Sequence, residues 1–318
     1  MGILANLIMC LCLTVCSCSV DQHAAVYNIM SGKDRNPPIF QGIETRDSSL
    51  LVIEFNEAIE CSIHDVSIDQ VDIDSLWSED HRLFVRLASP LLPGKPANFT
   101  ARVCDITGNS MRFSTRCWGK NERLPSVLIN EFTTKGNANH PDRIELICLE
   151  EGNLAGLSVY DGIGYSFDSE FIFPSFEVSS GTYVVLHYSS EPTGSNAWEF
   201  YGGSIGLGSN NGVLSLYECP QGHLIDAVAY SNRTSDSDEQ YGGFGTKKVF
   251  ERMLILEESG FWKTPLHPED AIDSTYTTAT RSMCRSNGTD TDSKHDWHVV
   301  PTSKASFGSE NCQEVYVP

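Results

Sequence analysis

The sequence has little positive charge and, after its first residues, no long apolar run. Its 22 Lys and Arg are outnumbered by 42 Asp and Glu, which gives a formal net charge of -20 at pH 7. An acidic surface of this size repels phosphate backbones, and the Lys and Arg form no basic cluster along the chain. Direct nucleic-acid binding is therefore not expected. No later apolar run approaches the roughly twenty residues that a membrane-spanning helix needs.

Catalytic and cofactor-binding patterns are also missing. No C-x-x-C pair occurs, and the wide cysteine spacing does not fit a zinc knuckle. The segments GLGS and GSNNG lack the G-x-S-x-G spacing of a nucleophile elbow. Gly206, Gly208 and Gly212 lead into VLSLYE, a strand pattern rather than a helix, so they do not form a dinucleotide-binding loop. We expect no enzymatic activity and no cofactor.

Two sets of polar residues are the remaining candidates for chemistry. Glu131 and Glu145 could form an acid–base pair, but glutamates on neighbouring strands more often hold strand ends or loop amides. Asp290, Asp292 and His295 are the weak metal candidates, because carboxylates and imidazoles both bind metals. Their segment DTDSKHD lacks the glycine and the distal glutamate of a calcium loop. We interpret it as an exposed acidic loop that leads into a core tryptophan, and we expect no metal.

The N-terminus carries a targeting pattern. Residues 3–15 are uncharged and mostly apolar, about the length of a signal-peptide core and too short to cross a bilayer. A bacterial lipoprotein signal ends in a small residue directly before the cysteine that carries the lipid. The small Ser17 precedes Cys18, whereas Val15 precedes Cys16, so V-C-S-C resembles a loose lipobox with Cys18 as the modified residue. Acylation would attach the protein to a membrane surface without spanning it. An ordinary secretory signal is the alternative.

Seven cysteines remain if Cys18 is acylated. They are Cys61, Cys104, Cys117, Cys148, Cys219, Cys284 and Cys312. Because the number is odd, at least one stays unpaired or pairs between chains. Buried free thiols or one or two disulfides are the two interpretations, with Cys284 and Cys312 as a candidate pair.

The first part of the mature chain alternates apolar and polar residues. We assign residues 1–17 to the signal peptide, 18–36 to a tether and 37–118 to a first domain. The segments LLVIEF and RLFVRLA have the period-two pattern of strands solvated on one face, and turn signals recur about every dozen residues, which favours a β-sandwich. The stretches VIEFNEAIE and LFVRLASPLLPGKPANFTARVCDITGN resemble bacterial Ig-like domains of the surface-layer type, over roughly residues 38–118. That resemblance implies a spacer or presentation module.

The second part begins after a polar linker, GKNERLP, at residues 119–125. The stretch SVLINEFTTKGNANHPDRIELICLEEGNLAGLSVYDG resembles the start of a lamin-tail domain, an Ig-type β-sandwich. Its opening motifs are carried by Ile129, Asn130, Glu131, Ile144, Glu145, Leu146, Leu154, Gly156, Leu157 and Asp161. Its closing motifs are carried by Ser282, Arg285, Asp296, Trp297, Gly308 and Asn311. The likeness runs from about 125 to 312 and implies a lamin-tail-like sandwich over residues 126–318.

The sequence departs from that family in three places. Arg143 stands where an aromatic is frequent, Ser306 and Phe307 replace a Thr-Pro, and residues 233–280 form an insertion. We expect the insertion to form long surface loops, because it contains the polar, glycine-rich stretch SDSDEQYGGFG.

These patterns together predict an all-β protein of two β-sandwich domains in tandem. We expect a non-enzymatic bacterial cell-envelope lipoprotein, anchored by lipid in the periplasm or at the outer-membrane surface. It would present the lamin-tail-like domain for binding or scaffolding, with an unknown protein or envelope ligand as partner. The alternative is an accessory subunit, or a cryptic metal-dependent hydrolase, of an extracellular nuclease or phosphatase system, since lamin-tail domains in bacteria often accompany such enzymes.

Overall fold

The computed structural model describes residues 34–190, 196–202, 206–232, 239–263 and 265–318. The predicted lipid-bearing Cys18 and the tether up to residue 33 lie outside the described residues. The chain divides into two compact units, the first built mainly from Leu51–Ala88 and Asn98–Thr115 and the second mainly from Arg116–Pro318. Both parts are β-sandwiches, so the predicted all-β class is confirmed.

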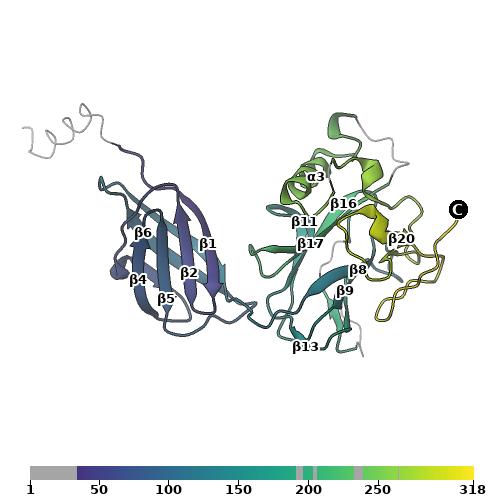
Figure 1. Ribbon diagram of the computed structural model, residues 1–318, viewed down its shortest axis with the longest axis horizontal. Helices are drawn as coiled ribbons and strands as arrows, with labels where there is room; N and C mark the ends of the chain where they lie inside the picture. The colour runs from purple at the N-terminus through teal and green to yellow at the C-terminus, as the bar shows by residue number, and fades with distance from the viewer. Residues whose placement is uncertain (1–33, 191–195, 203–205, 233–238, 264) are drawn as a thin grey trace, which may run out of the picture. The chain divides into compact units, whose positions relative to one another are not determined.

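The first sandwich pairs a four-stranded sheet with a three-stranded sheet (Figure 1). The first sheet contains, in spatial order, β1 (Phe40–Asp47), β2 (Leu50–Phe55), β5 (Arg82–Leu87) and β4 (Ile73–Glu79). The second contains β3 (Val66–Ile68), β6 (Pro96–Cys104) and β7 (Ser110–Trp118), and a 3-10 turn, η1 (Ile63–Asp65), precedes β3. Leu83, Val85 and Leu87 are buried, as the alternation in their segment predicts. Val52 and Phe84, on the face expected to be solvated, are buried as well, so that part of the expectation is wrong.

The second sandwich pairs a five-stranded sheet with a six-stranded sheet. The five-stranded sheet contains, in spatial order, β12 (Ser166–Ile172), β11 (Ser158–Ile163), β16 (Gly212–Tyr217), β17 (Leu224–Ser231) and β18 (Ile272–Asp273). The six-stranded sheet contains β15 (Glu199–Tyr201), β14 (Tyr183–His187), β9 (Arg143–Cys148), β8 (Val127–Thr133), β19 (Met283–Arg285) and β20 (Trp297–Val299). A short ribbon of β10 (Gly152–Asn153) and β13 (Glu177–Val178) completes the strands.

Strand pairing brings the two ends of this domain together. The late strand β19 lies beside the early strand β8, with Cys284 opposite Glu131. On its other side β19 pairs with β20, where Arg285 lies opposite Trp297. Residues about 150 positions apart in sequence are therefore neighbours in the six-stranded sheet, and this neighbourhood holds the charged residues described below.

The insertion at residues 233–280 is not only surface loops, and that expectation is wrong. It contains the helix α3 (Lys247–Ser259), which begins where the Thr246 side chain accepts a hydrogen bond from the Val249 amide. The helix ends at Gly260, whose φ of 77° favours glycine. Val249, Met253 and Leu256 are spaced by four and three residues and join the core of the second sandwich. This apolar period stabilises a helix within the insertion.

Three 3-10 turns complete the second sandwich: η2 (Glu239–Tyr241), η3 (Pro268–Asp270) and η4 (Lys294–Asp296). In the described parts of the chain, no helix has both the length and the apolar character needed to cross a membrane. The seven cysteines among the described residues are all free thiols, so the candidate bridge between Cys284 and Cys312 is not formed.

Candidate functional site

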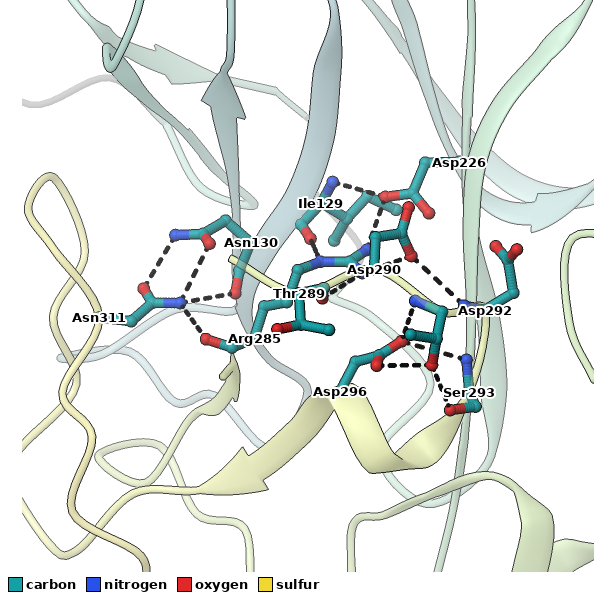
Figure 2. A network of polar contacts seen from close by, with 11 residues as sticks. Ile129, Asn130, Asp226, Arg285, Thr289, Asp290, Asp292, Ser293, Asp296 and Asn311 are labelled. Carbon is teal, nitrogen blue, oxygen red and sulfur yellow. Dashed lines mark hydrogen bonds and ion pairs between the residues drawn. The ribbon is translucent and has the colours of Figure 1, made fainter. Parts of the chain in front are cut away.

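A buried arginine on β19 lies within a network of polar contacts in the second sandwich (Figure 2). The side chain of Arg285 is 1% exposed. Its Nε donates to the Ile129 carbonyl at 2.9 Å, its Nη2 to Asp226 Oδ2 at 2.9 Å and its Nη1 to Asp290 Oδ1 at 2.7 Å. The guanidinium carbon lies 4.8 Å from the centre of the Trp297 ring. One side chain thus links β8, β17 and the loop after β19.

Asp226 is the buried partner of this arginine. It is 2% exposed and also accepts a hydrogen bond from the Ile129 amide at 2.7 Å. Burial raises the pKa of Asp226 to about 6, although the charge of Arg285 acts in the opposite direction. A buried charge is tolerated only when it is paired and hydrogen-bonded, and both conditions hold here. The contacts of this pair are those of a cross-link between strands.

The acidic loop after β19 is folded around a second carboxylate. Asp296 is 3% exposed and accepts hydrogen bonds from the Thr291 amide at 2.7 Å, the Thr291 hydroxyl at 2.8 Å and the Ser293 amide at 3.3 Å. Figure 2 shows Asp290 turned toward Arg285 and Asp296 turned into its own loop. Burial and the neighbouring Asp290 charge raise the pKa of Asp292. In this loop, Asp290 is thus held by an ion pair and Asp296 by local hydrogen bonds.

The three weak metal candidates do not converge. Asp290 is bonded to Arg285, whereas His295 lines a separate cavity of about 470 Å³ with Lys294 and Trp297. Over the residues that the structure describes, one group of three potential metal ligands has its ligand atoms within 4.8 Å of one another, and it consists of Asp34, Glu57 and Asp105 in the first sandwich. The candidate loop does not have this geometry.

Glu131 and Glu145 are fully buried and lie opposite each other on β8 and β9. Glu131 accepts hydrogen bonds from the Ser306 amide at 3.0 Å and the Ser306 hydroxyl at 2.8 Å. Glu145 accepts from Asn130 Nδ2 at 2.7 Å and from the Gly308 amide. The two glutamates thus hold residues 300–313, which we call the closing segment, against the six-stranded sheet. Acid–base chemistry would require access for a substrate, and neither side chain has any exposed surface.

Two asparagines join the closing segment to the arginine network. Asn130 Nδ2 donates to Asn311 Oδ1 at 2.8 Å, and Asn311 Nδ2 donates to Asn130 Oδ1 at 3.0 Å and to the Arg285 carbonyl at 2.9 Å (Figure 2). Both asparagines are buried. Residues from the opening and closing motifs of the domain therefore meet in one hydrogen-bonded unit.

Two of the departures from the lamin-tail pattern contact each other. The guanidinium carbon of Arg143 lies 3.9 Å from the centre of the Phe307 ring, which is a cation–π distance. Arg143 stands where the family often has an aromatic, and Phe307 introduces an aromatic where the family has a proline, so the two changes are complementary. Sequence alone gave no reason to connect them, because they are separated by most of the domain.

Asp226 is a network residue that the sequence patterns above do not identify. Its segment, LIDAVAY, is apolar on both sides of one aspartate, and an isolated charge in such a strand is the signal that could have identified it. The bonds of Ser306 and Asp290 to the network are also invisible in the sequence, because their partners are remote along the chain.

Glu145 gives the network a pH dependence. Burial raises its pKa to about 8, and the charge of Glu131 adds to this, while the Gly308 and Asn130 hydrogen bonds oppose it. The folded state then keeps a proton that the unfolded state loses near pH 4.5. The contribution of this proton to the free energy of unfolding is fully present below pH 4.5, the pKa of the unfolded state, and it is lost as the pH rises to about 8.

We therefore expect the free energy of unfolding to fall by about 1–2 kcal/mol between pH 6.5 and 8, since one proton contributes at most ~1.4 kcal/mol per pH unit. Urea titrations at these pH values measure it. Glu145→Gln should flatten the dependence, whereas Glu150→Gln, at an exposed position, should leave it unchanged. An equal slope in the wild type and the Glu145→Gln variant would show that another group is responsible.

Comparisons with known proteins add a family relation. A family model described as a protein second domain matches residues 125–199 and 193–299, which together cover more than half of the 318 residues. A search of curated proteins finds no match. Among solved structures, the chain is similar to a DUF4876 family protein from Bacteroides thetaiotaomicron VPI-5482, with a TM-score of 0.33 and 9% identity, over 75% of this chain and 88% of that chain.

Proposed function

We propose that this chain, which belongs to the family described as a protein second domain, is a non-enzymatic lipoprotein of the bacterial cell envelope. In this proposal Cys18 carries the lipid and anchors the protein to a membrane. The first sandwich acts as a spacer, and the second presents a lamin-tail-like surface for binding or scaffolding. The lipobox-like V-C-S-C segment carries the proposal, because it determines the compartment.

Contacts within the second sandwich support the lamin-tail assignment. Asn130 and Glu131, from the opening motif, are bonded to Asn311 and Ser306 of the closing segment. The motif residue Arg285 is bonded to the backbone of Ile129. The opening and closing motif residues, which lie far apart in the sequence, thus join the two ends of the domain.

The state of the charged groups supports a binding role over catalysis. Glu131 and Glu145 are buried beneath the closing segment, and the Asp226–Arg285 pair is buried between strands. A catalytic acid or base needs a position within hydrogen-bond reach of a substrate. The alternative of a cryptic metal-dependent hydrolase would need Asp290, Asp292 and His295 to bind one metal ion together. His295 lines a cavity that the two aspartates do not line.

The lipid anchor predicts different effects for two neighbouring cysteines. Cys18→Ala should move the protein from the detergent phase to the aqueous phase and remove labelled fatty acid, because the acylated thiol is lost. Cys16→Ala should change neither, since Val15 is a poor residue before a processed cysteine. Phase partition and metabolic labelling in a bacterial host measure both variants. Unchanged labelling of Cys18→Ala would refute lipidation at this residue.

A further inference from the structure

A polar cavity of about 580 Å³ opens above the asparagine pair of the second sandwich. Its floor is formed by Asn130 and Asn311, whose amides are bonded to each other. Its walls come from four separate segments of the domain. They are lined by Ile147, Tyr183, Asn287, Gly288, Glu310 and Gln313. The volume lies in the range of about 300–1,000 Å³ that is typical of small-ligand sites.

The walls offer hydrogen-bonding groups of both kinds. Over the described residues, the Tyr183 hydroxyl, the Asn287 amide and the Glu310 carboxylate make no hydrogen bond within the protein. An amide and a phenol both donate and accept, whereas a carboxylate only accepts. The Tyr183 ring and Ile147, which are cross-strand partners on β14 and β9, add apolar surface. Burial and the charges of Glu145 and Glu310 raise the pKa of Tyr183, so this hydroxyl keeps its proton at neutral pH.

The backbone around the cavity is held by the network beneath it. Asn311 donates a hydrogen bond to the Arg285 carbonyl, and its neighbour Glu310 belongs to the same closing segment. Asn287 and Gly288 form the turn directly after β19, with φ of 51° and 65°. These left-handed conformations suit Asn and Gly and direct the turn sharply. The cavity is therefore connected to the buried arginine through Asn311 and the turn after β19.

We propose that this cavity binds a neutral saccharide of one or two sugar rings, as part of an envelope glycan. Sugar hydroxyls donate and accept at once, and they match a wall of amides, phenol and carboxylate. Ring C–H groups match the apolar surface of Tyr183 and Ile147. The inference rests on the proposed binding function and specifies its ligand class.

Charge and topology disfavour other ligand classes. Among the residues that the structure describes, no Lys, Arg or His lines the cavity, so an anionic ligand would find no opposite charge there and would face Glu310. A peptide that adds a strand needs a free sheet edge. The strands β8, β9 and β14 each have a neighbour on both sides, so they offer none.

The test uses residues 19–318, the whole chain after the predicted lipid-bearing residue. Saturation-transfer NMR and calorimetry are carried out with maltose, cellobiose and N,N′-diacetylchitobiose as probes, and with glucuronate and tetra-alanine for comparison. We expect saturation transfer to at least one neutral disaccharide. The double variant N287G/E310Q should weaken that binding about 30-fold, because the Asn287 hydrogen bond is lost and the charge-assisted bond to Glu310 becomes a weaker neutral one. Glycine at 287 preserves the left-handed turn.

Two further variants separate binding from folding. Tyr183→Phe removes one hydroxyl and should weaken binding about fivefold while the melting temperature stays unchanged. Glu258→Gln, at an exposed position on α3, makes the same charge change as Glu310→Gln and should have no effect. Absence of transfer to every neutral disaccharide, equal binding by N287G/E310Q, or binding of only glucuronate or tetra-alanine would overturn the proposal. Because residue 18 is absent, none of these results depends on lipidation.

Discussion

Replacement of Arg285 by methionine should lower the free energy of unfolding of the second sandwich by about 3–5 kcal/mol. The change leaves Asp226 buried with no counter-charge, so that it must either stay charged in the core or take up a proton, and it removes the donor to the Ile129 carbonyl. An unpaired buried charge is among the most destabilising defects that one substitution can create. Urea denaturation followed by circular dichroism measures the loss.

The same stretch of chain supplies a control for this variant. Arg281 is four residues earlier, and its guanidinium carbon lies 4.1 Å from the centre of the Tyr316 ring, near the surface. Arg281→Met should cost less than about 1 kcal/mol. The double variant Asp226→Asn with Arg285→Met should recover part of the loss, since it removes both charges. An Arg285→Met protein with the stability of the wild type would contradict the role assigned to this network.

Truncation of Trp297 to alanine should cost a similar amount, about 3–5 kcal/mol. The side chain is 8% exposed, and its ring lies 5.3 Å from the Phe132 ring in an edge-to-face arrangement. The substitution removes a large buried surface and the ring over which Arg285 is held. A fall of the melting temperature of the second sandwich by several degrees is the expected measurement.

Trp198 provides the matched comparison, because it is 45% exposed in the same domain. Trp198→Ala should shift the free energy of unfolding by no more than about 0.5 kcal/mol. If the two tryptophan variants melted at the same temperature, Trp297 would not be the core residue that its sequence position and its contacts indicate.

Much of the fold could be predicted from local pattern. Period-two alternation identified the segments that form β2 and β5, and it correctly placed Leu83 and Val85 in the core. The step from a polar loop to an apolar triplet likewise placed Trp297 inside. The pattern identified the inward face, because alternate side chains of a strand point to the same face, but it did not show that Val52 and Phe84 on the other face are also covered.

The helix and the network could not be predicted in this way. The period of α3 lay inside an insertion dominated by glycine and acidic residues, and those turn signals concealed it. Asp226 and Arg285 are 59 positions apart, and a charge shows no partner until the strands are paired. The same holds for Arg143 and Phe307, whose complementarity depends on the closing segment lying over the sheet.

The cavity illustrates the same limit for function. Tyr183, Asn287 and Glu310 come from a strand, a turn and the closing segment, and nothing in their local sequence connects them. A site assembled by tertiary structure has no linear motif, so sequence reasoning reached the fold class but not this cavity.

Mass spectrometry of the N-terminal peptide of the protein purified from bacterial membranes tests the central claim most directly. The account predicts a peptide that begins at Cys18 and carries the added mass of acyl chains. A peptide that begins at any other residue, or one that begins at Cys18 without added lipid, would contradict it.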